Sequence, residues 1–419
     1  MDAPALLPPF RPLPIRALNA LGRSLERRGR PLFELDPESL LARARRASGL
    51  EDFGPESFRP GLERLARSLE EDARLSAFGR FFARRQIHEL LLLRLGLFAH
   101  RRAHPEVARE RIERPIFVLG LPRTGTTLLH GLLAADPAHR APLSWEVDQP
   151  FPPPEESTHA SDPRIAAVEK RFAQVRRLAP GFQTVHPVGA LLPQECIVIT
   201  ACEFMSLRFE MCFDVAGYQR WLPEQDLRPS YRFHRSFLQH LQSRLRRERW
   251  VLKSPGHLGP IDALLEVYPD ALLVQTHRDP LRVIPSVASL ELHMRRVGCD
   301  EVDLHALGRQ QLEVWRRLLE QGMAVRERLH ARAGGIADVH FRDLLSDPIA
   351  CVERIYRHFG LELRPGAERR MREYLARHPR DEHGVHRYSL AQFGLDAAAV
   401  RDAFRGYCER FGVEPESAP

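Results

Sequence analysis

The feature that most constrains the fold is a short apolar run followed by a glycine-bounded loop and a helical pattern. Residues 115–119 are continuously apolar, as expected for a strand buried on both faces of a parallel sheet. Residues 120–125 begin and end with glycine, and residues 126–135 are predicted to form a helix. This order predicts a phosphate loop, because backbone N–H groups and the positive end of the helix dipole point into it.

The loop lacks the lysine of a nucleotide triphosphatase. Residues 120–127 read Gly-Leu-Pro-Arg-Thr-Gly-Thr-Thr, so Thr126 stands where the Walker A pattern has lysine. That lysine reaches the outer phosphates of a nucleotide triphosphate, and its absence argues against magnesium-dependent triphosphate chemistry. The spacing is also not Gly-x-Gly-x-x-Gly, which argues against a dinucleotide-binding fold. Arg123 offers a forked cation, and Thr126 and Thr127 offer hydroxyls, to a bound anion.

Further strands and helices alternate after the loop. Apolar runs predict three more strands, and each lies next to a helical pattern. Alternation of this kind predicts an α/β fold in which a parallel sheet lies between two layers of helices (α/β/α). The predicted strands are residues 250–253, 271–276 and 336–341, and the predicted helices between them are residues 258–267, 281–296 and 304–333.

The rest of the chain reads as helical. Residues 1–113 are predicted to form an N-terminal helical segment that carries no recognisable chemistry, and residues 114–419 to form the α/β domain. A helical insert rich in Phe, Met and Cys interrupts that domain at about residues 163–249 and includes a predicted helix over 231–249.

A second group of candidate ligand-binding residues follows two predicted strands. Lys253 ends one of them, and Arg278 comes just after the next. Ser286 lies eight residues after Arg278, early in a predicted helix. Ligands bind at the carboxyl edge of open α/β sheets. We therefore predict that Arg278 and Ser286 hold a second phosphate near the first.

Composition excludes several classes of protein. The chain has 419 residues and a net charge of +7, but its basic residues are spread among acidic ones, which argues against a nucleic-acid partner. No stretch approaches the roughly 20 apolar residues of a membrane span. The start lacks the pattern of a secretory signal, and six cysteines form no C-x-x-C pair, so we expect a cytoplasmic protein with reduced thiols. No metal-binding constellation is visible.

The chain resembles the sulfotransferases that use 3′-phosphoadenosine 5′-phosphosulfate (PAPS), in particular their broad bacterial branch. The resemblance covers about residues 114–419 and is carried by residues 115–137, 251–258, 271–290 and 338–348. It implies that the first loop binds the 5′-phosphosulfate, and that Arg278 and Ser286 bind the 3′-phosphate. It also implies that Arg387 and Tyr388 close over the donor. The implied loop residues are Pro122, Arg123, Thr124, Gly125, Thr126 and Thr127.

The implied reaction moves the sulfuryl group from PAPS to a hydroxyl or amine and releases PAP without a metal. Arg123 and Lys253 would stabilise charge on the leaving oxygen. Three residues are candidates for the catalytic base. Glu146 and His257 are equally favoured, and Glu195 is favoured less. Histidine titrates near neutral pH unaided, whereas a glutamate needs burial or a nearby like charge to raise its pKa.

The acceptor is less constrained. The apolar insert predicts a small hydrophobic acceptor. Two other functions compete with sulfuryl transfer. A nucleotide-dependent phosphotransferase of the P-loop class would need a loop lysine and an acidic Mg²⁺ partner, and the sequence offers neither. A catalytically silent PAP- or PAPS-binding module would bind without turnover, and it stays open because the base is not identified.

Overall fold

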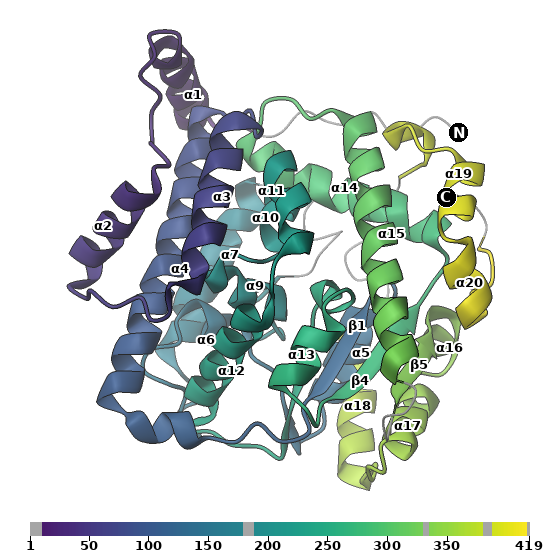
Figure 1. The fold of residues 1–419 in the computed structure, drawn as a ribbon. Coiled ribbons are helices and arrows are strands. Elements are labelled where there is room, and N and C mark those ends of the chain that lie inside the picture. Colours follow the sequence, from purple (N-terminus) through teal and green to yellow (C-terminus); the bar gives the residue numbers. More distant parts are fainter. Residues whose placement is uncertain (1–10, 179–187, 330–334, 380–387, 417–419) are drawn as a thin grey trace.

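A five-stranded parallel sheet forms the centre of the molecule (Figure 1). The computed structural model describes residues 11–178, 188–329, 335–379 and 388–416. The strand order across the sheet is β2-β3-β1-β4-β5. The strands are β1 (Ile116–Gly120), β2 (His139–Arg140), β3 (Arg249–Lys253), β4 (Leu272–His277) and β5 (Ile336–His340).

Four of these strands were predicted and one was not. The apolar runs at β1, β3, β4 and β5 became strands whose ends differ from the prediction by at most one residue. β2 has only two residues and lies next to β3 at the edge of the sheet. Two residues are too short for an alternating or continuous apolar pattern, so the sequence carries no signal for it.

Helices cover both faces of the sheet, which confirms the three-layer α/β/α fold. Ile116 and Val118 of β1 belong to a core with α5 (Thr126–Ala134) and α17 (Pro348–His358). Phe117 and Leu119 belong to a larger core on the other face. Side chains alternate between the two faces along a strand, and all five residues of β1 are buried. Both faces are therefore apolar, as the continuous apolar run predicted.

The N-terminal helices share that larger core. The long helix α4 begins after Ser76, whose hydroxyl accepts a hydrogen bond from the N–H of Gly79. Arg94, in the middle of α4, is fully buried and pairs with Glu203 of the insert. The proposed division at residue 114 stays a prediction, and the core is continuous across it. The helices are α1 (Leu13–Glu26), α2 (Pro37–Ser48), α3 (Arg59–Glu71) and α4 (Ala77–Ala103).

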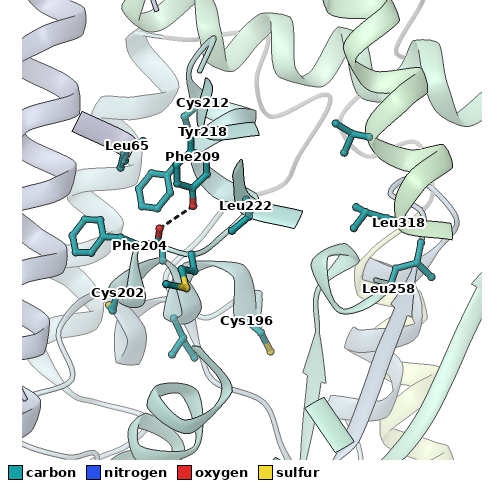
Figure 2. Close-up of a cluster of buried hydrophobic side chains, with 14 of the residues drawn as sticks. Leu65, Cys196, Cys202, Phe204, Phe209, Cys212, Tyr218, Leu222, Leu258 and Leu318 are labelled. Carbon is teal, nitrogen blue, oxygen red and sulfur yellow. Dashed lines mark hydrogen bonds between the residues drawn. The ribbon is translucent and has the colours of Figure 1, made fainter. Parts of the chain in front are cut away.

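Most aromatic residues of the insert are core. Phe204 and Phe209 stack in a buried cluster, and the hydroxyl of Tyr218 donates a hydrogen bond of 2.9 Å to the carbonyl oxygen of Phe204 (Figure 2). The helix predicted over 231–249 is wrong at its end, because α12 stops at Gln242 and β3 starts at Arg249. The helices of this region are α6 (Ser144–Asp148), α7 (Pro163–Leu178), α9 (Cys196–Thr200), α10 (Arg208–Cys212), α11 (Ala216–Trp221) and α12 (Arg228–Gln242).

The remaining helices follow β3, β4 and β5 and build the C-terminal part. Nowhere in the described ranges is there a helix whose length and apolar character would let it cross a membrane. These helices are α13 (Ile261–Val267), α14 (Pro280–Gly298), α15 (Leu304–Leu329), α16 (Phe341–Ser346), α18 (Pro365–Arg377), α19 (Ala397–Ala403) and α20 (Arg405–Phe411).

Candidate active site

The carboxyl ends of the three central strands meet at one edge of the sheet. Gly120 at the end of β1 is in register with Thr276 of β4. Val118 of β1 is in register with Lys253, the last residue of β3. The loops that follow these strands therefore leave the sheet side by side, which is the usual place for a ligand in an open α/β sheet.

The phosphate loop, residues 120–127, has a constrained backbone. Gly120 has φ 138°, and a Cβ atom there would lie 2.5 Å from the hydroxyl of Thr276. Arg123 has φ 65°, a left-handed conformation that costs energy for a residue with a side chain. The buried hydroxyl of Thr124 donates to the carbonyl of Leu121 at 2.6 Å and contacts the hydroxyl of Thr276 at 2.6 Å. These two contacts of the Thr124 hydroxyl hold the loop close to β4.

Arg123, Ser286 and Arg278 lie together next to this loop. The Nε of Arg123 donates to the Oγ of Ser286 at 3.2 Å. The guanidinium of Arg278 donates to the carbonyl oxygen of Arg123 at 2.9 Å. Burial, with Arg278 nearby, lowers the pKa of Arg123 from its ordinary value. Two cations held close together in partly buried positions favour a bound anion.

A carboxylate already contacts this cluster. The two oxygens of Glu416 accept hydrogen bonds from Arg278 at 2.8 and 3.0 Å. The backbone N–H of Glu416 donates to Asp279 at 2.7 Å, which fixes this part of the C-terminal segment. The Arg278 guanidinium also lies 3.9 Å from the ring centre of Phe341. Sequence reasoning missed Glu416, since no motif surrounds it.

Lys253 and Glu195 form an ion pair beside the start of α5. Lys253 is almost completely buried, and its Nζ also donates to the hydroxyl of Thr127 at 3.4 Å. The Glu195 side chain is 14% exposed and precedes the first residue of α9. Of the three base candidates, Glu195 is therefore the one in contact with a residue that touches the phosphate loop.

Glu146 is enclosed by other partners. It is fully buried, and its carboxylate accepts hydrogen bonds from Arg140 at 2.6 Å and from the N–H of Leu143 at 2.8 Å. His159 contacts the same carboxylate at 3.0 Å. Burial acts to raise the pKa of Glu146, but Arg140, His159 and the Leu143 N–H outweigh it and hold that pKa below its usual range. An ionised carboxylate with this many partners is a poor proton acceptor.

His257 is a buried neutral histidine. It ends a short 3₁₀ turn (Pro255–His257) after β3, and its Nδ1 lies 2.9 Å from the hydroxyl of Tyr231. The ring packs edge-on against Phe117, with 5.1 Å between ring centres. Burial lowers the pKa of His257 well below its usual value. A low pKa makes an imidazole a weak base, although it can still orient a hydroxyl by hydrogen bonding.

The remaining predicted site residues are Tyr388 and Arg387. The hydroxyl of Tyr388 donates to the carbonyl oxygen of Arg282 at 3.1 Å, and Arg282 lies on α14 between Arg278 and Ser286. Arg387 lies outside the described residues. Within the described ranges, no group of three or more His, Cys, Asp or Glu side chains is arranged to hold a metal ion.

Comparison with known proteins decides the family. A family model described as the sulfotransferase family matches residues 115–365, which contain the phosphate loop, Lys253, Arg278 and Ser286. The chain belongs to the sulfotransferase family. This sulfotransferase shares 35% sequence identity with the crystal structure of sulfotransferase STF1 from Mycobacterium tuberculosis. The TM-score is 0.80, and the match covers 89% of this chain and 100% of that one.

Other sulfotransferases agree. The crystal structure of sulfotransferase STF9 from Mycobacterium avium has a TM-score of 0.83 at 30% identity, covering 91% of this chain and 98% of that one. The omega-hydroxy-beta-dihydromenaquinone-9 sulfotransferase Stf3 of Mycobacterium tuberculosis is 26% identical over 321 residues, 73% of this chain and 77% of its own length. Sulfotransferase activity, which the family resemblance implied, is confirmed, and neither the phosphotransferase nor the silent module is favoured.

Proposed function

We propose that this sulfotransferase takes the sulfuryl group from PAPS and transfers it to a hydroxyl group of a small hydrophobic acceptor. One observation carries the proposal. The Lys253–Glu195 pair and the cluster of Arg123, Arg278 and Ser286 flank a single phosphate loop at one edge of the sheet. PAPS has two separate anionic ends, and this edge offers two separate groups of cations and hydroxyls.

The residues present fit both ends of PAPS. The backbone N–H groups at the start of α5, with Arg123, Thr126 and Thr127, would hold the 5′-phosphosulfate. Arg278 and Ser286 would hold the 3′-phosphate, and Arg278 would exchange Glu416 for it. Gly125 has φ 86°, which lets the chain turn from the loop into the helix. Thr124 would act through its backbone, because its hydroxyl is bonded inside the protein. Closure by Tyr388 and Arg387 remains a prediction.

PAPS supplies a sulfuryl group bonded to a phosphate oxygen. Transfer breaks that S–O bond, leaves its electron pair on the phosphate of PAP, and forms an S–O bond to the acceptor oxygen. Arg123 and the Nζ of Lys253 neutralise the charge that grows on the leaving oxygen. The reaction needs a base for the acceptor's hydroxyl proton and no change of oxidation state.

We assign the base to Glu195, ahead of Glu146 and His257. Lys253 neutralises Glu195 before the donor binds. The phosphosulfate then competes for the Lys253 ammonium, and a carboxylate that loses its cation becomes more basic. Glu195 is partly exposed, so an acceptor hydroxyl can approach it. What supports this assignment over Glu146 is exposure and position. Glu146 is fully buried, whereas Glu195 is 14% exposed and contacts Lys253 beside the phosphate loop.

A hydrophobic alcohol as acceptor is supported by a relative. The name of the similar Stf3 protein describes a hydroxylated dihydromenaquinone, which is an apolar molecule with a hydroxyl. We extend that class, and not that molecule, to this chain. We also keep the cytoplasmic location as a prediction, because all six cysteines are unpaired and five of them are buried.

Calorimetric titration with PAP tests the donor. Binding that is independent of Mg²⁺, absent with ATP, and lost in Arg123→Ala is the expected result. Magnesium-dependent ATP binding in place of PAP binding would overturn the donor assignment. With the donor established, Glu195→Gln and Glu146→Gln compared in an acceptor screen test the base.

A further inference from the structure

A cavity of about 610 Å³ is lined by residues from the two segments that carry Lys253 and Glu195. Ser254, the residue after Lys253, lines it, and so does Ile197, two residues after Glu195. Leu222 of the insert and Leu318 of α15 line it from either side (Figure 2). Volumes of about 300–1,000 Å³ are typical of small-molecule sites. The cavity therefore has the size and the position of a site for the second substrate.

The charged residues that line this cavity largely neutralise one another. Arg228 pairs with Asp226 at 2.8 Å and approaches Glu266 at 3.4 Å. Arg328 lies 3.8 Å from Asp262. Exposed pairs of this kind leave little net field to attract an ion. The charges thus favour an uncharged ligand over an ionic one.

Buried polar atoms of three lining residues have no hydrogen-bond partner among the described residues. They are the Nε2 of His257, the Oε2 of Glu210 and the Nε of Arg317. Burial and the neighbouring Glu291 raise the pKa of Glu210 to about 8, so this carboxyl is mainly protonated at neutral pH. A buried polar atom without a partner costs about 1–3 kcal/mol. A ligand recovers part of that energy when a small shift of these side chains opens the atoms to the cavity.

We propose that this cavity is the acceptor site, and that it binds an uncharged, apolar molecule with a hydroxyl group. The inference rests on the proposed function, because it identifies the occupant of the second substrate site of the same reaction. His257 and Glu210 are positioning residues: they form hydrogen bonds with the polar groups of the acceptor and so orient it. The apolar walls formed by Leu222, Tyr231 and Leu318 hold its body.

The probe for this proposal is 2-naphthol, compared with its ether 2-methoxynaphthalene and the anion 2-naphthoate. We expect 2-naphthol to bind the PAP-loaded protein at least about tenfold more tightly than either analogue, since one lost hydrogen bond to a buried group is worth about 1.4 kcal/mol. We also expect 2-naphthyl sulfate to form when PAPS is supplied. Equal or tighter binding of 2-naphthoate would overturn the choice of an uncharged ligand.

Two substitutions that fill the cavity test whether 2-naphthol binds there. Leu222→Trp fills it from the insert, and Ala324→Trp fills it from an exposed position on α15, where a larger side chain leaves the core intact. Both should weaken 2-naphthol binding by about tenfold or more. Leu21→Trp, an exposed change on α1, is the matched control and should change nothing.

PAP titration of the same variants separates this inference from the donor assignment. Normal PAP binding with lost 2-naphthol binding supports both. Normal PAP binding with unchanged 2-naphthol binding in the two tryptophan variants overturns the cavity as acceptor site and leaves the donor assignment standing. Binding of 2-naphthol without sulfation in an enzyme that binds PAP also overturns it. Failure of the wild type to bind PAP overturns the donor assignment alone.

Discussion

Two carboxylate–cation pairs lie on neighbouring segments of this sulfotransferase, and they differ in what surrounds them. Glu146 pairs with Arg140, and Glu195 pairs with Lys253. The two segments are bridged in antiparallel fashion, and the N–H of Ser144 donates to the carbonyl of Leu192 at 3.0 Å. Yet the Glu146 side chain is 0% exposed and has two further partners, whereas Glu195 is 14% exposed beside the phosphate loop.

The difference lies mainly in the cation. Arg140 uses its forked guanidinium to hold the carbonyl oxygens of Leu241 and Leu245, at 2.8 and 2.5 Å, as well as Glu146. Arg140 cannot move away from Glu146 without also breaking its hydrogen bonds to these two carbonyl oxygens. Lys253 is a point charge on a flexible stem, and it already contacts Thr127 of the loop. The first pair therefore suits a structural role, and the second suits an exchange of partners during a reaction.

Removing the lysine gives the largest expected effect. Lys253→Met should lower kcat by about 10³-fold, because it deletes the charge opposite the leaving oxygen and leaves Glu195 without its cation. Single-turnover kinetics with saturating PAPS measures this. Lys253→Arg is the matched variant: it keeps the charge but changes its shape, and it should recover only part of the rate. A normal rate in Lys253→Met would show that the Lys253–Glu195 pair takes no part in the reaction.

Neutralising Glu195 comes next. Glu195→Gln should lower kcat by about 10²-fold, at the lower end of the loss expected when a positioned base is removed. The KM for PAPS should stay within about threefold, because Glu195 competes with the donor and does not hold it. The pH-rate profile should also lose its acidic limb. An unchanged rate with an altered KM would show that the carboxylate serves binding and not proton transfer.

Glu146→Gln should act on stability and spare the chemistry. It leaves Arg140 buried without its carboxylate, a change that costs about 3–5 kcal/mol. Denaturant unfolding measures the loss, and kcat per folded molecule should match the wild type. A second substitution, Arg140→Met, made together with Glu146→Gln, should restore part of the stability, since it removes the uncompensated charge. A large fall in kcat with normal stability would show that Glu146 serves the reaction and not the stability of the fold.

Titration extends the contrast to a third carboxyl group. The lowered pKa of Glu146 means that its contribution to stability is present above the unfolded pKa, near 4.5, and is lost as pH falls through the folded pKa. The pKa of Glu210 is raised to about 8, so stability is full below the unfolded value and is lost as pH rises toward 8. Thermal unfolding from about pH 2 to about pH 9 should show both losses, since the Glu146 loss lies below the unfolded pKa.

Substitution assigns each loss to its residue. Glu146→Gln should remove the acid-side loss of stability, and Glu210→Gln should reduce the decline between about pH 4.5 and pH 8. Part of that decline should remain in Glu210→Gln, because the pKa of Glu291 is also raised, to about 7. An identical pH profile in Glu210→Gln and the wild type would show that this carboxyl is ionised in the folded protein.

The sequence predicts local features well and partner choice poorly. Continuous apolar runs gave four of the five strands, and the glycines at 120 and 125 predicted the loop, because both signals are local. The base could not be chosen this way. Glu146 and His257 were equally favoured as candidates, but the role of Glu146 depends on its contacts with Arg140 and His159. Glu195 meets Lys253 across 58 residues. Glu416 meets Arg278 across 138 residues, and no local pattern marks that contact.

The smallest expected effect concerns Glu416. Glu416→Gln should tighten PAP binding by about fivefold, because the 3′-phosphate would no longer displace a carboxylate from Arg278, and a partly exposed pair is worth about 1 kcal/mol. Glu414→Gln is the control, since Glu414 pairs with the exposed Arg342 and not with Arg278. The gain should shrink as salt rises from 0.05 to about 0.5 M, because screening weakens the internal pair. Equal PAP affinity in the two variants would mean that the 3′-phosphate and Glu416 occupy different places, and Arg278 would then hold the C-terminal segment and not the donor.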